Sequence, residues 1–318
     1  MKQQITNTIL MIRPVRFRMN EQTAVNNYFM EDTALRDADV NSRAQQEFDA
    51  FVKVLEGIGI HVIVVEDKFD PDTPDSIFPN NWISFHASGT VVLYPMFAVN
   101  RRKERREDIL DLLEEKGYQI NQVIDYSPAE RDELFLEGTG SVVMDRVNQK
   151  VYCALSARAH EALILEFCED FHCTPVIFTA YQSLEDGSRL PIYHTNVMMC
   201  IADQYAVICL DTIDDMEERQ NVVQHLQSDG KEIVEITEVQ MNHFAGNMLQ
   251  VSGKNGQKHL VMSSAAYNSL RPEQLETLMK YNPIVHSSLD TIEQCGGGSA
   301  RCMMAEIFLP QTVGPNQD

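Results

Sequence analysis

The residues best suited to chemistry are a cysteine, a histidine and a glutamate that lie far apart in the chain. Cys302 follows three consecutive glycines at 296–298, and glycine allows backbone conformations and close ligand approach that other residues exclude. His194 opens an apolar run, and Glu137 stands between the apolar triplet 134–136 and a Gly-Thr-Gly turn. A cysteine and a histidine, with a carboxylate to orient the histidine, form the general arrangement of an activated nucleophile.

Each of these residues alone also fits a structural role. A cysteine near a strand is more often a small core residue, and a histidine at a strand start is usually a hydrogen-bonded part of the core. A carboxylate between apolar residues is costly unless it has a partner. The functional interpretation therefore depends on where the three residues stand in the overall pattern of the chain.

That pattern is a repeat of strand, polar loop, amphipathic helix, second strand and polar residue, with steps of roughly 50 to 60 residues. Repeats of this length usually cannot bury their apolar faces alone and pack against one another. We expect helices at 41–57, 102–117, 157–171, 215–230 and 272–281. The polar residues fall at one phase of every unit, so a ring of units would bring them together at its centre: Asn81, Glu137, His194, a patch at 242–247, and Cys302.

The apolar runs between these helices predict the strands 9–12, 61–65, 90–96, 119–124, 150–155, 175–179, 205–210, 232–236, 259–263, 284–286 and 303–309. The last strand has no helix after it and would complete the unit that the N-terminus begins, which closes the ring. No linker separates two halves, so we expect one domain over residues 1–311 and a frayed tail at 312–318. The long polar and aromatic segment 13–40 is either a lid or a surface excursion.

Composition narrows the classes of partner and the cellular locations that we expect for this chain. A net charge of −21 argues against nucleic acid and anionic membranes as partners, because both require basic patches. No apolar run is long enough to span a membrane, and the first 14 residues predict a buried strand rather than a signal peptide. Most of the seven cysteines lie in apolar runs, which fits a reducing cytoplasm. Cys168, His172 and Cys173 lack a second ligand pair, so we expect no metal.

Five segments resemble motifs of the guanidine-modifying pentein superfamily, which includes dimethylargininase, arginine deiminase and the amidinotransferases. The similarity is greatest to its amidinotransferase-like or citrulline-utilisation hydrolase branch. Segment 73–81 (TPDSIFPNN) resembles the dimethylargininase substrate loop, and 297–302 (GGSARC) resembles the deiminase nucleophile turn. The other three motifs are 101–104 (RRKE), 136–138 (LEG) and 154–158 (ALSAR). The resemblance implies an α/β fold, a five-fold pseudo-symmetric ββαβ propeller.

The resemblance also implies roles for individual residues. Cys302 would attack the carbon of a guanidino or ureido group, and His194 would protonate the departing nitrogen and then activate water. Glu137 would hold the ring of His194. No metal or organic cofactor would be needed. The residues expected to grip the amino-acid end of the substrate are Asp75, Arg101 and Arg158, although Arg101 lies in a basic run that could be a solvated face.

Three amides stand where related enzymes carry acids. Dimethylargininases have Glu-Asp where this chain has Asn80 and Asn81, and deiminases have an acid where it has Asn196. A buried guanidinium without carboxylates is costly, whereas a neutral ureido group is satisfied by amide hydrogen bonds. We therefore expect these three amides to bind substrate, and we favour citrulline, a ureido compound.

Three functions remain open. The first is hydrolysis of a C–N bond in a ureido or guanidino compound, including arginine or dimethylarginine. The second is amidinotransfer, which uses the same nucleophile but passes the adduct to an amine. The third is non-enzymatic binding on the same fold, as in a ribosome anti-association factor, which predicts loss of the Cys–His–Glu set and a charged surface for RNA. The sequence leaves the oligomeric state open, a homodimer included.

Overall fold

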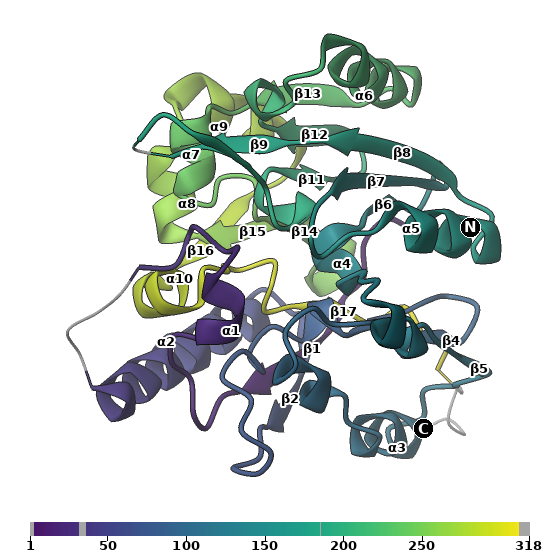
Figure 1. Ribbon diagram of the computed structural model, residues 1–318, viewed down its shortest axis with the longest axis vertical. Coiled ribbons are helices and arrows are strands. Elements are labelled where there is room, and N and C mark those ends of the chain that lie inside the picture. The colour runs from purple at the N-terminus through teal and green to yellow at the C-terminus, as the bar shows by residue number, and fades with distance from the viewer. Residues whose placement is uncertain (1–2, 32–35, 185, 312–318) are drawn as a thin grey trace.

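Within the part of the chain that the structure describes, five three-stranded sheets share one strand arrangement (Figure 1). The computed structural model describes residues 3–31, 36–184 and 186–311, so the predicted tail at 312–318 lies outside the described residues. In each sheet the middle strand pairs antiparallel with one neighbour and parallel with the other. The strand orders are β17-β1-β2, β3-β4-β5, β6-β7-β8, β11-β12-β13 and β14-β15-β16.

The strands are short, and several are buried along their whole length. The middle strands are β1 (Thr8–Arg13), β4 (Thr90–Leu93), β7 (Lys150–Leu155), β12 (Tyr205–Ile208) and β15 (Lys258–Ser263). Their parallel partners are β2 (His61–Glu66), β5 (Gln122–Asp125), β8 (Thr174–Thr179), β13 (Glu232–Glu235) and β16 (Ile284–Ser287). Their antiparallel partners are β3 (Ile83–Phe85), β6 (Val143–Asp145), β11 (Met199–Ile201), β14 (Leu249–Ser252) and β17 (Ala305–Glu306).

A helix connects each middle strand to its parallel partner, because a parallel pair needs a crossover connection. These helices lie around the rim of the molecule in Figure 1, in sequence order around the centre. Their apolar faces point inward; α2, for example, buries Ala44, Phe48 and Phe51. The five helices are α2 (Asp37–Gly57), α3 (Asp108–Glu115), α5 (Glu161–Asp170), α6 (Met216–Ser228) and α9 (Pro272–Tyr281).

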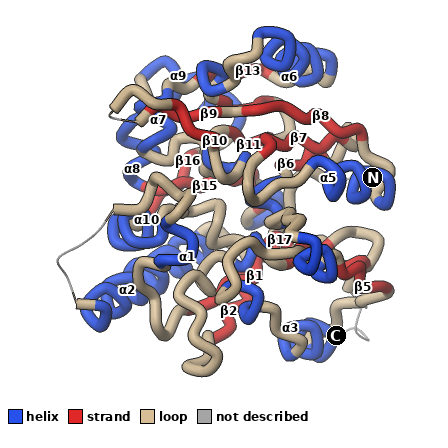
Figure 2. Tube along the Cα trace, in the orientation of Figure 1, coloured by secondary structure: helices blue, strands red, loops and turns tan. Residues whose placement is uncertain are grey.

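Shorter elements lie between the long ones, and α7 and α8 are at the edge of the molecule in Figure 2. The short helices are α1 (Glu21–Ala24), α4 (Gly138–Ser141), α7 (Glu238–Asn242), α8 (Ser264–Ser269) and α10 (Asp290–Gly296). Two 3₁₀ turns matter for the site, η1 (Pro79–Asn81) and η4 (Thr195–Val197). A surface hairpin joins β9 (Tyr181–Ser183) to β10 (Arg189–Pro191).

Three of the contacts between neighbouring sheets join antiparallel strands. β3 contacts β17, β6 contacts β11, and β11 contacts β14, while α4 contacts both β3 and β6. Thr6 joins two sheets, because its carbonyl accepts a hydrogen bond from the N–H of Ser252 and its hydroxyl donates to the carbonyl of Ile307 at 2.7 Å. Among the described residues, no helix is long and apolar enough to cross a membrane.

The predicted helix at 102–117 is wrong in its first part. The chain forms a 3₁₀ turn at Arg101–Glu104, and only Asp108–Glu115 is α-helical. The break lies at Arg105, whose backbone is extended. Its side chain forms an ion pair with Glu130 at 2.6 Å, so tertiary contacts outweigh the local helical pattern.

The predicted strand at 303–309 is also too long, since β17 covers two residues. The segment before it is a turn, in which the N–H groups of Cys302 and Met303 donate to the carbonyl of Ser299. The expected pairing with the N-terminal strand is confirmed, because β17 pairs antiparallel with β1. The predicted helix at 272–281 and strand at 150–155 agree with α9 and β7.

Candidate active site

A narrow buried cavity collects six of the nine predicted site residues. It is lined by Asp75, Asn81, Arg101, Arg158, His194 and Cys302, together with Asn27, Phe78, Tyr193, Gly296 and Gly298. Its open volume is about 10 Å³, roughly the room of one water molecule. Of the other three, Glu137 pairs with His194, Asn196 contacts the sulfur of Cys302, and Asn80 is buried without lining the cavity.

The polar residues stand at equivalent places in their sheets. Each lies in or beside the short helical turn that leads into an antiparallel strand. Asn81 ends η1 before β3, Glu137 caps α4 before β6, and His194 caps η4 before β11. Cys302 lies in the turn before β17. The repeat phase seen in the sequence therefore corresponds to one structural position in four of the five sheets.

His194 and Glu137 form a buried hydrogen-bonded pair. The Nε2 atom of His194 lies 2.8 Å from Oε2 of Glu137, and both side chains are almost fully buried. Because a carboxylate only accepts, Nε2 carries the proton in this pair. The Nδ1 atom of His194 has no hydrogen-bond partner among the described residues. It lies beside Gly140, where an added Cβ would come within 2.8 Å of Nδ1, so this position requires glycine.

Charges around Glu137 keep it ionised. Burial raises the pKa of Glu137, but the guanidinium of Arg158, the hydrogen bond from His194 and the charge of Arg101 outweigh burial and lower it to about 2. Arg158 Nη1 lies 3.5 Å and Arg101 Nη1 4.0 Å from Oε2 of Glu137. The other oxygen accepts from the backbone N–H of Phe97 at 3.0 Å.

The imidazole of His194 is neutral at pH 7 in this environment. Burial lowers its pKa, Glu137 opposes that effect, and Arg158 and Arg101 add to it, so that the pKa of His194 falls to about 4. A neutral ring with its proton on Nε2 has a lone pair on Nδ1. The histidine is therefore in the form that accepts a proton.

Two amide side chains surround the sulfur of Cys302. Asn247 Nδ2 donates to the sulfur at 3.2 Å, and Asn196 Nδ2 lies 3.6 Å from it. Asn247 is held in place because its oxygen accepts from the N–H of Arg301 at 3.0 Å and its Nδ2 also donates to the carbonyl of Asn196 at 2.9 Å. The sequence placed a polar patch at 242–247 but did not single out Asn247.

Arg101 is tightly bound inside the protein rather than solvated. Its Nε and Nη2 atoms both donate to Glu104 at 2.9 Å. Its Nη1 donates to Oδ1 of Asn81 at 2.8 Å, and Nη2 also contacts the carbonyl of Phe78 at 3.2 Å. The alternative interpretation of Arg101 as part of a solvated face is therefore wrong, since its side chain is 2% exposed.

Arg158 and Asp75 are covered by the segment around α1. Arg158 Nε donates to Asn26 Oδ1 at 2.9 Å and Nη2 donates to the carbonyl of Thr23 at 2.9 Å. Its guanidinium also lies over the ring of Tyr193, 4.8 Å from the centroid. One oxygen of Asp75 accepts from Thr23 at 3.0 Å and from Asn20 at 2.8 Å.

We call residues 20–31 the cover segment. Besides these contacts, Asn27 Nδ2 donates to the carbonyl of Gly296 at 3.3 Å, and the N–H of Glu31 donates to the carbonyl of Gln294 at 2.8 Å. In Figure 1, α1 accordingly lies beside α10. The predicted lid at 13–40 thus includes a segment that contacts the cavity, although 32–35 lie outside the described residues and its movement stays a prediction. The sequence did not identify Asn20, Thr23 or Asn27 as contact residues.

Several buried polar atoms near the cavity lack a partner within the described part of the chain. They are Oδ1 of Asp75, Nδ2 of Asn81 and both amide atoms of Asn80. The amide of Asn81 has a defined orientation, because Arg101 can only donate and so must face the oxygen. Its Nδ2 is therefore an unused donor, and it lies beside Gly140, whose added Cβ would come within 2.4 Å of it.

No cluster of His, Cys, Asp or Glu able to hold a metal ion occurs in the described ranges. The polar atoms at the cavity are instead an arginine pair, two carboxylates, amides, an imidazole and a thiol. This set can bind a small zwitterion and can carry out nucleophilic attack with proton transfer.

The five sheets and the cavity joining Cys302 to His194 define a member of the guanidine-modifying pentein superfamily, to which dimethylargininase and arginine deiminase are related. Residues 13–309 match the sequence profile of the family described as N,N dimethylarginine dimethylhydrolase, eukaryotic. The chain therefore belongs to this family. None of the curated proteins matches the chain by sequence.

Solved structures share the fold at low sequence identity. The apo form of ArgZ, an arginine dihydrolase from the ornithine-ammonia cycle in cyanobacteria, matches with a TM-score of 0.71 and 16% identity, over 96% of this chain and 41% of that chain. The N-terminal domain of ArgZ bound to product matches with a TM-score of 0.71 and 17% identity, over 95% and 99%. An adduct of a dimethylarginine dimethylaminohydrolase variant with S-methyl-L-thiocitrulline gives 0.62 and 13%, over 95% and 100%. The chain thus spans about two fifths of the apo ArgZ chain.

Proposed function

We propose that this chain is a hydrolase of C–N bonds in an arginine-related ureido or guanidino compound, with citrulline favoured, and that Cys302 forms a covalent intermediate. The observation that carries the proposal is the single cavity lined by Cys302 and His194, with Glu137 hydrogen-bonded behind the imidazole. A further support is that another structure of the ArgZ N-terminal domain is covalently bound to a reaction intermediate.

The unused donor of Asn81 supports a ureido substrate. A guanidinium presents only N–H groups, which cannot pair with Nδ2 of Asn81, whereas a ureido oxygen can accept from it. The oxygens of Glu137, which would have to accept from a guanidinium, already pair with His194, Arg158 and the backbone N–H of Phe97. The unpaired oxygen of Asp75 would accept from the substrate's α-ammonium group.

In the proposed reaction, the Cys302 thiol passes its proton to Nδ1 of His194 and the sulfur attacks the ureido carbon. The bond to the terminal nitrogen breaks, and that nitrogen takes the proton from His194 and leaves as ammonia. Water then adds to the S-carbamoyl cysteine and gives a proton to His194. The C–S bond breaks, the thiol regains its proton, and the released carbamate loses CO₂ to form ornithine.

Hydrolysis of dimethylarginine or arginine is the second candidate, and family membership favours it. The same nucleophile and imidazole would serve, with Glu137 as the sole carboxylate for the guanidinium. Amidinotransfer would need an amine acceptor in place of water. Non-enzymatic binding is disfavoured, because the chain retains Cys302, His194 and Glu137 around one cavity and has a net charge of −21.

We also infer that the five sheets close into a five-fold propeller and that residues 1–311 form one domain in the cytoplasm. The contacts between antiparallel strands and the pairing of β17 with β1 support closure. The cysteines buried in the core fit a reducing compartment. The cavity is too small for an amino acid, so the cover segment must open for substrate to enter.

The test is a comparison of initial rates, measured as ammonia release from citrulline and arginine and as dimethylamine release from dimethylarginine, with and without an added amine. We expect the highest kcat/KM with citrulline and no dependence on the amine. Cys302→Ser should abolish turnover and the covalent adduct seen by mass spectrometry of the intact protein, whereas Cys173→Ser should retain both. Full activity of Cys302→Ser would overturn the mechanism, and a preference for dimethylarginine would support the second candidate.

A further inference from the structure

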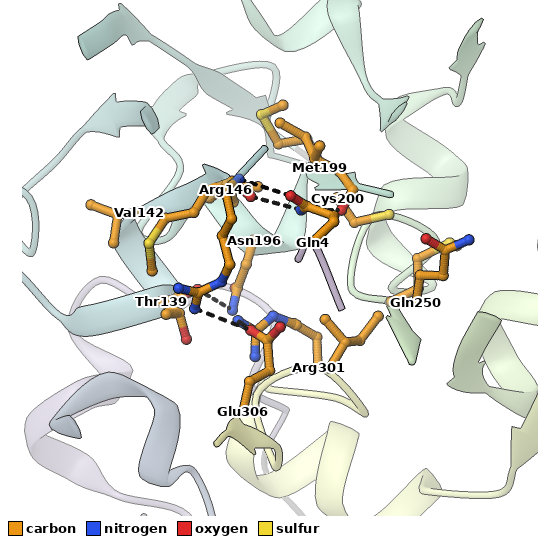
Figure 3. Close-up of a pocket in the computed structure, with 15 residues that line it drawn as sticks. Gln4, Thr139, Val142, Arg146, Asn196, Met199, Cys200, Gln250, Arg301 and Glu306 are labelled. Atoms are coloured by element: carbon orange, nitrogen blue, oxygen red, sulfur yellow. Dashed lines mark hydrogen bonds and ion pairs between the residues drawn. The ribbon is translucent and has the colours of Figure 1, made fainter. Parts of the chain in front are cut away.

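A second cavity adjoins Asn196, the residue whose amide contacts the sulfur of Cys302. Its open volume is about 30 Å³, and its walls come from β6, β11, β14 and the segment 301–306. Asn196 and Thr139 both line it. Figure 3 shows the side chains of Arg146 and Arg301 converging on Glu306 in this cavity.

The charges in this cavity do not balance. Arg301 Nη2 pairs with Oε2 of Glu306 at 2.9 Å, and its Nη1 donates to the carbonyl of Met304 at 2.8 Å. Arg146 Nη2 is 4.0 Å from the same carboxylate oxygen. Two guanidinium groups therefore share one carboxylate, which leaves one positive charge without a counter-ion, in a protein whose net charge is −21.

The guanidinium of Arg146 is the uncompensated group. Within the described residues it donates no hydrogen bond, and it lies over the ring of Phe308, 4.0 Å from the centroid. Its side chain is only 13% exposed. Burial lowers the pKa of Arg146, Glu306 opposes this, and Arg301 lowers it further. A largely desolvated cation without a hydrogen bond is stabilised when a negative group approaches it.

The neighbouring polar groups cannot supply that negative charge. Asp145 is the last residue of β6 and precedes Arg146 in the chain. It already pairs with Lys231 at 3.1 Å and with Asn148 at 2.9 Å. The amide nitrogen of Gln4 donates to the carbonyls of Met144 and Ile201, and that of Gln250 donates to Asn282. Gln250 accordingly points away from the two arginines in Figure 3.

We propose that this cavity is a binding site for one small monovalent inorganic anion of the halide class, held between Arg146 and Arg301. One negative charge would neutralise the excess of the Arg–Glu–Arg cluster, and the unused N–H groups of Arg146 would donate to it. The volume fits a monatomic ion or one to two waters, so we expect a halide rather than phosphate or a carboxylic acid. This cavity shares no lining residue with the proposed substrate cavity.

Thermal unfolding at constant ionic strength tests the site without an activity assay. Replacing sodium gluconate stepwise with sodium chloride or bromide should raise the Tm and reach a plateau in the millimolar range, because a ligand bound only by the folded state stabilises it by mass action. Arg146→Met should remove the plateau. Arg43→Met, which removes the same charge from an exposed helix position, should keep it.

Bromide-soaked crystals give the second measurement, since the anomalous signal of bromine would place the ion. We expect a peak within hydrogen-bond distance of the guanidinium groups of Arg146 and Arg301. The proposal is overturned if the cavity holds only water and the Tm changes linearly with each salt, without a plateau. It is equally overturned if Arg146→Met and Arg43→Met respond to chloride alike.

Discussion

At the scale of single residues, the candidate site is defined by which polar atoms are already paired. Glu137 is engaged by His194, Arg158 and a backbone N–H, so it cannot rearrange without breaking several contacts. Asn81 keeps a free donor because Arg101 occupies its oxygen. The preference between ureido and guanidino substrates should therefore depend on Asn81 more than on Glu137.

Asn81→Asp should shift the preference towards guanidino substrates. An aspartate would still accept from Arg101, but its second oxygen would place an acceptor with negative charge where the amide now donates. We expect the ratio of kcat/KM for arginine to kcat/KM for citrulline to rise roughly 5- to 150-fold, which corresponds to about 1–3 kcal/mol. Asn255→Asp, which adds the same charge at an exposed turn, controls for net charge. An unchanged ratio would show that this amide does not select substrate charge.

Asn247 is the position where a substitution tests whether an amide stabilises the thiolate of Cys302. Asn247→Asp keeps the oxygen that accepts from Arg301 but replaces the donor to Cys302 with an oxygen, which repels a thiolate. We expect alkylation of Cys302 by iodoacetamide at pH 7 to slow by about 10-fold or more. Asn242→Asp changes an exposed residue of the same patch. In this control variant, Cys302 should be alkylated at the wild-type rate. Equal rates in both variants would mean that the amide does not stabilise the thiolate.

At the scale of elements, the sequence predicts long helices and middle strands well and short elements poorly. Helices such as α9 carry more than two turns of apolar spacing, which is a local signal. The helices α1 and α4 have four residues each, too few for any period, and they form because tertiary contacts fix them. The break before α3 arises the same way, since Arg105 pairs with a residue 25 positions later.

The residues of the site also divide into those with a signal in the sequence and those fixed only by tertiary contacts. Cys302, His194 and Glu137 could be predicted because the repeat places them at one phase, and the repeat is visible in the sequence. Asn26 and Thr23 could not be predicted, because their contacts with Arg158 arise only when the cover segment packs across the cavity. Polar residues in an irregular segment carry no periodicity that would reveal such a contact.

Asn26→Ala should loosen the cover segment. It removes the acceptor of hydrogen bonds from Nε and Nη2 of Arg158, and hydrogen bonds to a charged group contribute about 1.5–3 kcal/mol each. Hydrogen exchange of the peptide spanning residues 20–31 should become about 10-fold faster or more, with the rest of the chain unchanged. Val25→Ala, at a side chain that is 64% exposed, serves as the control. If the two variants exchange alike, the contact with Arg158 does not hold the segment closed.

At the scale of the whole molecule, the first and last strands belong to one sheet. β1 pairs antiparallel with β17, so these two strands, far apart in the sequence, must come together before that sheet is complete. Thr6 extends the link to a second sheet, since it contacts both Ile307 and Ser252. The closed ring that we propose predicts that no single sheet is stable without its neighbours, because each would rely on them to bury its apolar face.

Thr6→Val tests whether the sheets unfold as one unit. The change keeps the shape of the side chain but removes the hydrogen bond to the carbonyl of Ile307, which we expect to lower the free energy of unfolding by about 1–2 kcal/mol. Trp82, the single tryptophan, reports on the turn before β3, whereas circular dichroism reports on every helix. If the chain is one closed domain, both probes should give the same urea midpoint, lowered equally by Thr6→Val and unaffected by Thr174→Val at an exposed position. Separate transitions for the two probes would instead divide the chain into independently folding parts and would remove the argument that ring closure positions Cys302 against His194.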